Sequence, residues 1–175
     1  MGSVKTSLCI LTISSLLISC TNYQSGTASG SIEIKDSAKV PVPVTLSHLQ
    51  SLFDSITNAN YIESKMVELD FSKKYNGVYI SNNLISANEP KHWIHINDMG
   101  KYSNVTFSTA DLVSWKRVVN ELTQQVKPKR FKSENSDIAE RYSLEKYSVQ
   151  TYEPANGINL ELNSLYQILI KHPEK

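Results

Sequence analysis

Cysteine is nearly absent from this chain of 175 residues, and both of its cysteines, Cys9 and Cys20, lie near the N-terminus. Residues 21–175 therefore contain no thiol, which excludes disulfides, thiol catalysis and zinc–thiolate sites from that part of the chain. Any domain formed there must be stabilised by the packing of its core alone.

A surplus of charge is missing as well. The chain has 18 basic and 17 acidic residues, which gives a formal net charge of +1. This balance argues against a protein built around DNA, RNA or an acidic polymer, since such proteins carry a strongly basic surface. The six glycines are scattered singly, so the sequence has no phosphate-binding glycine loop, and it has no Gly-x-Ser-x-Gly nucleophile motif.

The N-terminal segment has the features of a secretory signal. Lys5 is the only charge in the first 32 residues, and an apolar run of eleven residues extends from Leu8 to Ile18. At ~1.5 Å per helical residue this run spans ~16 Å, which is too short for a hydrocarbon core of ~30 Å. A positive start and a short apolar run predict a cleaved signal rather than a permanent transmembrane helix.

The run ends in Leu17-Ile18-Ser19-Cys20, which resembles the lipobox of bacterial lipoproteins: apolar, variable, small, cysteine. The resemblance implies cleavage before Cys20, lipid attachment to its sulfur and acylation of the new amino group. Each buried CH₂ contributes ~0.8 kcal/mol, so two or three acyl chains would anchor the protein firmly. Thr21, in place of an Asp that favours inner-membrane retention, implies the outer membrane. The alternative is an ordinary secretory signal with an incidental cysteine.

The sequence therefore divides into a signal peptide at 1–19, a tether at 20–31 and one domain at 32–175. The tether is uncharged and rich in Ser, Thr and Gly, and eleven such residues would hold the domain roughly 15–20 Å from the membrane. The mature chain, Cys20 to Lys175, has 156 residues, with 17 basic and 17 acidic residues once Lys5 is removed. This length suits a single domain with a real core.

Apolar residues at helical spacing predict two or three helices. The first begins at Ser47, which has capping-box spacing to Gln50, and the second begins at Ser108, which has the same spacing to Asp111. A short third helix would be capped by Asn163 or Ser164. The apolar positions are Leu49, Leu52, Phe53 and Ile56 in the first helix, Leu112, Trp115, Val119, Leu122 and Val126 in the second, and Leu165, Ile168 and Leu169 in the third.

Alternating apolar and polar residues predict strands at 32–34, 67–71, 78–80, 93–96, 105–107, 147–152 and 158–162. Asn76-Gly77 is a hairpin signal between the second and third of these. Residues 127–141 are polar and charged, and we expect a long exposed connection there. The pattern predicts an α+β domain with an antiparallel sheet of five to eight strands and two or three helices packed on one face.

One internal similarity suggests a duplicated strand–strand–helix unit with a pseudo-twofold core. Two segments share the same spacing of apolar residues, and each is interpreted as a strand, a turn and a capped helix. The alternative is that any strand followed by a capped helix gives this spacing. The matched positions are Val105, Phe107, Leu112 and Trp115 in the first segment, and Ile158, Leu160, Leu165 and Ile168 in the second.

Neither the histidines nor the paired carboxylates predict a specific reaction. His92 and His95 are the only close histidines, and residues three apart on a strand face opposite sides, so they cannot chelate one metal. We expect no metal, no cofactor and no catalytic set. Glu68 and Asp70 would share one strand face and, with His95, are the residues that a dispersed enzyme site would use; a solvated strand face is the simpler interpretation.

Two features favour partner contacts instead. Lys127, Lys129, Arg130 and Lys132 place four cations in six residues, which suits lipopolysaccharide or the acidic patch of a protein; a solvated linker neutralised by nearby acids is the alternative. Tyrosine is abundant, with nine residues, and Tyr152 is expected to point outward, where tyrosines serve binding. The candidate contacts are therefore Lys129, Arg130 and Tyr152.

These observations favour a non-enzymatic, lipid-anchored binding or accessory protein of the bacterial cell envelope, either a component of an envelope complex or an inhibitor or immunity protein. The expected place is the outer membrane, facing the periplasm. The expected partners are the membrane, through the N-terminal lipid, and an envelope protein, with no nucleic acid. An envelope hydrolase with a site assembled from dispersed residues and a structural spacer without a ligand are the alternatives.

Overall fold

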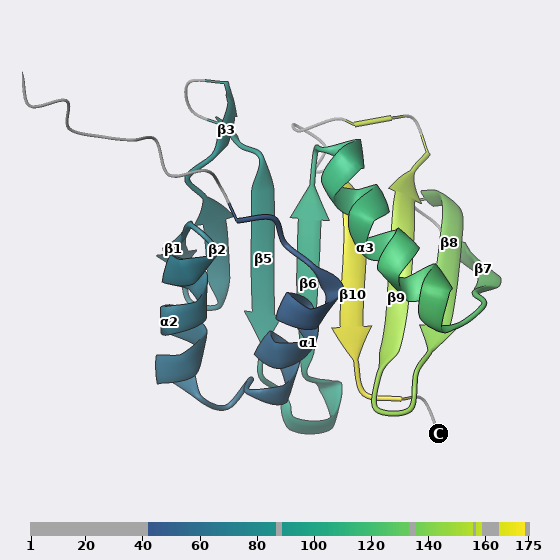
Figure 1. Ribbon diagram of the computed structural model, residues 1–175, viewed down its shortest axis with the longest axis horizontal. Helices are drawn as coiled ribbons and strands as arrows, with labels where there is room; N and C mark the ends of the chain where they lie inside the picture. The colour runs from purple at the N-terminus through teal and green to yellow at the C-terminus, as the bar shows by residue number, and fades with distance from the viewer. Residues whose placement is uncertain (1–41, 87–88, 134–135, 156, 159–164, 174–175) are drawn as a thin grey trace, which may run out of the picture. The chain divides into compact units, whose positions relative to one another are not determined.

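The computed structural model describes residues 42–86, 89–133, 136–155, 157–158 and 165–173. The signal segment, the tether, the strand expected at 32–34 and most of the one expected at 158–162 lie outside these ranges. The described residues form one antiparallel sheet of eight strands, three helices on one face of it and a separate two-stranded ribbon (Figure 1). The predicted α+β class, strand number and helix placement are confirmed.

The elements fall into two groups along the chain. The first group is α1 (Leu46–Asp54), α2 (Ala59–Glu68), β1 (Phe71–Tyr75), β2 (Val78–Ser81), the ribbon β3 (Leu84–Ser86) and β4 (Glu89–Pro90), β5 (His92–Asn97), a 3-10 turn (Gly100–Tyr102) and β6 (Asn104–Thr109). The second group is α3 (Leu112–Gln125), β7 (Lys129–Ser133), β8 (Ser136–Ser143), β9 (Ser148–Pro154) and β10 (Tyr166–Lys171).

The sheet consists of two four-stranded meanders joined through their last strands, in the order β1-β2-β5-β6-β10-β9-β8-β7. A helix precedes each meander, since α2 leads into β1 and α3 leads into β7. β6 and β10 pair antiparallel, from Asn104 opposite Lys171 to Thr109 opposite Tyr166. The described residues therefore form a repeat of helix plus four strands, which differs from the strand–strand–helix unit that the spacing of the apolar residues suggested as one of two interpretations.

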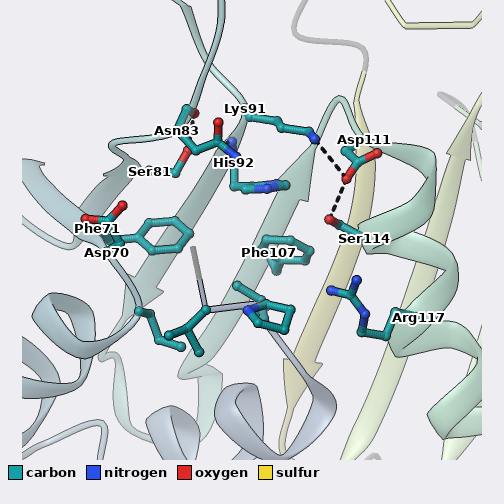
Figure 2. Close-up of a pocket in the computed structure, with 14 residues that line it drawn as sticks. Asp70, Phe71, Ser81, Asn83, Lys91, His92, Phe107, Asp111, Ser114 and Arg117 are labelled. Atoms are coloured by element: carbon teal, nitrogen blue, oxygen red, sulfur yellow. Dashed lines mark hydrogen bonds and ion pairs between the residues drawn. The ribbon is translucent and has the colours of Figure 1, made fainter. Parts of the chain in front are cut away.

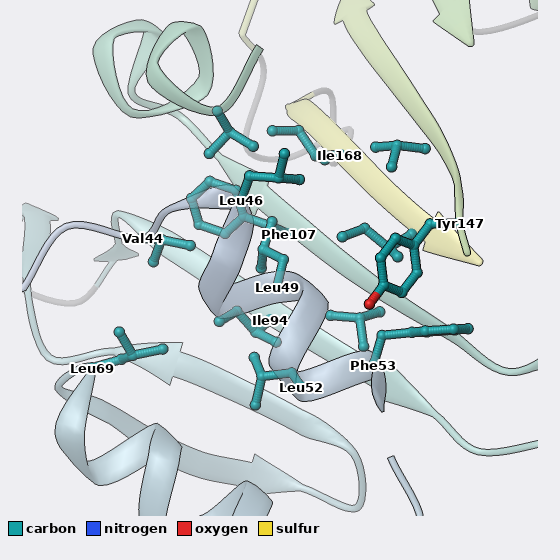
Figure 3. Close-up of a cluster of buried hydrophobic side chains, with 14 of the residues drawn as sticks. Val44, Leu46, Leu49, Leu52, Phe53, Leu69, Ile94, Phe107, Tyr147 and Ile168 are labelled. Carbon is teal, nitrogen blue, oxygen red and sulfur yellow. The ribbon is translucent and has the colours of Figure 1, made fainter. Parts of the chain in front are cut away.

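The core lies between the sheet and the helix layer. Helix α1 buries Leu46, Leu49 and Leu52 against the centre of the sheet, where Phe107 and Ile94 are also fully buried (Figure 3). Each such side chain contributes roughly 1.5–3 kcal/mol of transfer free energy on burial. The helix begins with a capping box in which Thr45 Oγ1 accepts from His48 N at 3.3 Å, two residues before the cap expected at Ser47.

Helix α3 packs on β10 and β6. Asp111, and not the expected Ser108, caps it by accepting a hydrogen bond from Val113 N at 3.2 Å, because Ser108 still belongs to strand β6. Pro128 follows soon after the end of the helix. Trp115 is 8% exposed and Leu122 is fully buried, as expected, but Leu112 is 36% exposed. The Trp115 indole Nε1 donates to the carbonyl of Gln167 on β10 at 3.3 Å, which satisfies its one polar atom.

The strand expected at 67–71 is wrong except at Phe71, because Ala59–Glu68 forms helix α2 and Leu69 and Asp70 form the turn after it. Asn58 Oδ1 caps it by accepting from Tyr61 N at 3.1 Å, and Ile62 and Met66, four residues apart, are its only buried residues. Such a narrow apolar stripe is a weak helical signal. Asp70 then turns the chain into β1 at φ 64, a left-handed conformation that Asp tolerates better than most residues.

Two further expectations are wrong. The polar stretch at 127–141 forms the hairpin of β7 and β8 at the sheet edge, where backbone pairing needs no apolar stripe and charged residues protect the free edge. The expected C-terminal helix is strand β10. Ile168 and Ile170, two residues apart and both fully buried, face the helix layer, whereas Leu169 lies on the other face.

Candidate functional site

The sheet face opposite the helices is covered by no helix of the described residues (Figure 1). We call it the open face. Strand pairing aligns its side chains into rows that cross the sheet, because directly paired residues point to the same side. One row is Ser72, Ile80, Trp93, Ser108, Gln167, Tyr152, Ala139 and Phe131, and the next is Val78, His95, Thr106, Leu169, Gln150, Arg141 and Lys129.

Aromatic side chains flank the centre of the open face. Trp93 and Tyr152 lie on either side of Ser108 and Gln167 in one row, roughly 14 Å apart at ~4.8 Å per strand. Phe131 continues the row; its ring meets Tyr152 edge-to-face at 5.9 Å. Trp93 and Tyr152 are amphipathic aromatics, a residue type favoured at binding surfaces.

The charges of the open face are all positive among its paired residues. Lys129 and Arg141 stand opposite each other in the second row, and Lys171 belongs to a third row with Asn104 and Ser148. None of the residues in these rows is Asp or Glu. The Arg141 guanidinium also lies over the Phe131 ring at 5.2 Å, which joins the cations to the aromatic row.

Gln150 contacts both Arg141 and Lys171. Its side chain is buried in the sheet surface between them, and the residue is only 5% exposed. The amide orientation that satisfies its neighbours places its oxygen 3.1 and 3.2 Å from Arg141 Nη2 and Nε and 3.3 Å from Lys171 Nζ. Its nitrogen then donates to Tyr152 Oη at 2.6 Å. Because two cations share one buried oxygen, they are held close together.

The structure separates the three candidate contacts. Lys129 and Tyr152 lie on the open face, whereas the neighbouring Arg130 points to the helix side, with its Nε 3.5 Å from Glu140 Oε1. Its side chain is 81% exposed, so this ion pair contributes little. Cys20 lies outside the described residues. Sequence reasoning missed Trp93 and Arg141, because only the strand register shows that they share a face with Tyr152.

The candidate residues of a dispersed enzyme site lie on different elements. His95 is exposed on the open face, opposite Thr106. Glu68 ends helix α2 and pairs with Lys65 at 2.7 Å, and Asp70 accepts from Asn82 Nδ2 at 2.9 Å in the turn after it. Glu68 and Asp70 therefore do not share a strand face.

A cavity of about 230 Å³ lies on the helix side of the sheet (Figure 2). The chain leading into α1, the ends of β2 and β5, and the first turns of α3 enclose it. Its apolar lining includes Val44, Phe71 and Phe107, and its polar lining includes Lys91, His92, Asp111, Ser114 and Arg117.

His92 is held in a fixed orientation inside this cavity. Its Nδ1 lies 2.8 Å from Thr109 Oγ1, and its ring packs on Phe107 at 5.6 Å. Thr109 Oγ1 also donates to the Lys91 carbonyl at 3.3 Å and accepts from Asp111 N at 2.8 Å. Burial and, next, the Lys91 charge lower the pKa of His92 to about 4, so the imidazole is neutral at pH 7.

A second polar network lines the rim of the cavity. Asp111 Oδ2 accepts from Ser114 Oγ at 2.6 Å and lies 3.2 Å from Lys91 Nζ. Burial tends to raise the pKa of Asp111, but the hydrogen bonds from Ser114 and Lys91 outweigh it and hold the pKa below its ordinary value. The Ser114 hydroxyl thus faces a carboxylate, and no serine hydroxyl contacts an imidazole within the described ranges, so the cavity lacks a serine–histidine pair.

Over the described part of the chain, no three His, Cys, Asp or Glu side chains lie close enough to hold a metal ion. No helix in that part is both long and apolar enough to span a membrane. Comparison with known proteins found no matching family model, no matching curated protein and no matching solved structure.

The lowered pKa of His92 predicts a loss of stability in mild acid. An ordinary histidine titrates near 6.5, and His92 in the folded protein titrates near 4. Between these values the unfolded chain binds more protons, so the free energy of unfolding should fall as the pH drops from 6.5 to 4, by ~1–3 kcal/mol after solvent screening of a half-buried ring. Urea unfolding at several pH values measures this slope.

His92→Gln should show a flatter slope than the native protein, while His95→Gln, at an exposed site, should keep the native slope. His48, whose pKa burial also lowers, contributes in the same direction in all three proteins. An unchanged slope in His92→Gln would show that the folded protein does not suppress protonation at His92.

Proposed function

We propose that this chain is a lipid-anchored accessory protein of the bacterial cell envelope that binds an acidic protein partner through its open face. The motif Leu17-Ile18-Ser19-Cys20 supports the anchor, and Thr21 after it supports the outer-membrane position, with the domain facing the periplasm. The open face supports the binding role. Its aromatic row and its cations occupy a continuous surface, with Trp93 and Tyr152 on either side of its centre.

The observation that carries this proposal is the position of Lys129, Arg141 and Lys171, the charged residues among the described strand-paired residues of the open face, beside its aromatic row. The chain as a whole is almost neutral, so this face differs from the average of the molecule. Acidic side chains such as Glu63 and Glu121 make their contacts on the helix side of the sheet instead, with Lys73 Nζ of β1 and with Leu46 N of α1 respectively. A cationic face with half-buried aromatics complements a partner with acidic side chains around an apolar centre.

The size of the open face suits a protein partner. Eight strands at ~4.8 Å span about 34 Å, and three rows of side chains cover roughly 15–20 Å along the strands. The resulting area, on the order of 600 Å², approaches the ~800 Å² that each partner buries in a stable protein complex. A structural spacer has no need for such a surface, and the hydrolase alternative has no nucleophile–base pair in the described cavity to support it.

The anchor is tested by replacing Cys20 with Ala and fractionating the cells. Loss of the lipid should move the protein from the membrane pellet to the soluble periplasmic fraction and change its electrophoretic mobility. Ile18→Leu, at the variable position of the motif, controls for general damage to the signal. A Cys20→Ala protein that still pellets with membranes at native mobility would contradict the lipid anchor.

The binding face is tested by two charge reversals at neighbouring positions of β7. Lys129→Glu acts on the open face and should weaken partner capture roughly 3- to 10-fold, because it opposes an acidic partner and neutralises Arg141 across the strand pair. Arg130→Glu points to the helix side and should leave capture unchanged. Crosslinking in intact cells followed by quantitative mass spectrometry measures capture of the same partner by each variant.

Thermal unfolding of both variants confirms that the fold is kept, since both side chains are exposed at a sheet edge. Equal effects of the two reversals on capture would contradict the open face as the docking surface. Capture of lipopolysaccharide alone, with the same dependence on Lys129, would show that the partner is an anionic lipid and not a protein.

A further inference from the structure

Large apolar side chains are exposed at two neighbouring hairpin tips, residues 74–77 between β1 and β2 and residues 98–103 between β5 and β6 (Figure 1). Among the described residues, five large apolar side chains are more than 60% exposed, and three of them, Tyr75, Met99 and Tyr102, lie at these tips. The tips are adjacent, because Ile96 N donates to the Gly77 carbonyl at 2.7 Å. Single exposed apolar residues are ordinary on a protein surface, but three on adjacent turns favour an interaction surface.

Hydrogen bonds hold the turn between β5 and β6 in a defined shape. Ser103 is 2% exposed, and its hydroxyl accepts from Met99 N at 2.8 Å and donates to Asp98 Oδ1 at 3.1 Å. Ser103 N also donates to the Gly100 carbonyl at 3.0 Å. These polar groups find their partners inside the turn, whereas the side chains of Met99 and Tyr102 are left to solvent. The exposure of the two side chains is therefore a property of the folded turn.

A lysine lies over each of the two tyrosine rings at the tips. Lys74 Nζ is 5.4 Å from the centroid of the Tyr75 ring, and Lys101 Nζ is 4.8 Å from that of the Tyr102 ring. Both lysines are exposed. Each pair combines an amphipathic ring with a charge on a flexible stem, and these two residue types are favoured where a protein meets the headgroups of a bilayer.

The acidic residues at this end of the sheet have contacts of their own. Three carboxylates are engaged there, Glu63 with Lys73 Nζ at 2.6 Å, Asp98 with Ser103 Oγ at 3.1 Å and Asp54 with Tyr147 Oη at 2.7 Å. Glu145 is next to Lys146 in the separate hairpin of β8 and β9. Lys74 and Lys101 take part in no ion pair with a described residue. Their position beside exposed aromatics suits a surface that is negatively charged and apolar beneath.

We infer that the two tips dock on an anionic phospholipid surface, with Tyr75, Met99 and Tyr102 at the headgroup boundary and the lysines on phosphate groups. This inference rests on the lipid anchor of the proposed function, which keeps the domain near a bilayer. The 21 residues between Cys20 and Val42 span at most ~70 Å, against ~20 Å for a six-residue strand, so the anchor allows the tips to reach the bilayer. Because the strands end at the tips, this contact holds them upright on the membrane and turns the open face sideways toward a partner.

The test uses the lipidated protein purified from its membranes, with Met99→Cys labelled by an environment-sensitive fluorophore. The protein is placed in vesicles of phosphatidylcholine alone or of phosphatidylcholine mixed with phosphatidylglycerol. It should float with both kinds of vesicle, but the emission should shift to the blue only in the mixed vesicles, and high salt should reduce the shift. Val113→Cys is the matched control, because Val113 is 67% exposed and lies on α3, which begins beyond the far end of β6; its label should not shift.

Lys101→Glu should lower the equilibrium constant of the contact at least about 5-fold, since removing one lysine from an anionic surface costs roughly that factor. Lys116→Glu, the same charge reversal at an exposed position of α3, should leave the contact unchanged. A protein that does not float would contradict the anchor and, with it, this inference. Flotation with an unshifted label at position 99, equal shifts at positions 99 and 113, equal shifts in the two kinds of vesicle, or equal effects of the two charge reversals would overturn the inference and leave the anchor standing.

Discussion

The antiparallel pairing of β6 with β10 is the interaction on which this domain depends. It brings residues 104–109 against residues 166–171 and joins two four-stranded meanders into one sheet. Val105, Phe107, Ile168 and Ile170 meet at this junction, all fully buried, and α1 packs across both strands. Without the pairing, each meander would expose a second unpaired edge and α1 would lose its platform. The paired strands are distant in sequence, so bringing them together costs loop-closure entropy. Only the contacts made by both meanders together offset this cost.

The position of the helices follows from the same junction. It also determines which side chains remain on the open face and which enclose the cavity. Helices α1, α2 and α3 all pack on the side where the central strands present their aliphatic residues (Figure 1). The alternate residues of the same strands point away from the helices. The open face therefore has Ser108 and Gln167 at its centre and aromatics beside them. Polar groups near the ends of β2 and β5 meet the start of α3 and form the cavity (Figure 2). Core packing on one face therefore gives the molecule two distinct candidate sites.

Local signals made part of this fold predictable from the sequence. Asn76-Gly77 specifies the first hairpin, with Gly77 at φ 71 and no room for a Cβ beside the Ile96 carbonyl. The amphipathic stripe of α3 predicts both the helix and the burial of Trp115. By contrast, Ile168 and Leu169 in β10 fit helical and strand spacing equally well, and only their partners on β6 and β9 decide between the two. The charged strand β7 gives no apolar pattern because it needs none at an edge.

The candidate sites were harder to predict, because they depend on pairing between distant segments. Tyr152 and Lys129 were identified from composition, but their common face follows from the order β9-β8-β7. The orientation of His92 depends on Thr109, which lies 17 residues away and is brought into contact by the pairing of β5 with β6. Neither relationship is encoded in a short motif, and both require the register of the sheet.

The central claim, that the partner docks on the open face, is tested most directly by site-specific crosslinking in cells. No cysteine follows Cys20, so one introduced cysteine carries a photoactivatable crosslinker at a unique position of the folded domain. Thr106→Cys places it at the centre of the open face, and Val113→Cys places it on α3, where the side chain is 67% exposed. The account predicts a discrete protein adduct from position 106 and none from position 113. An adduct from position 113 alone, or the same adduct from both positions, would contradict it.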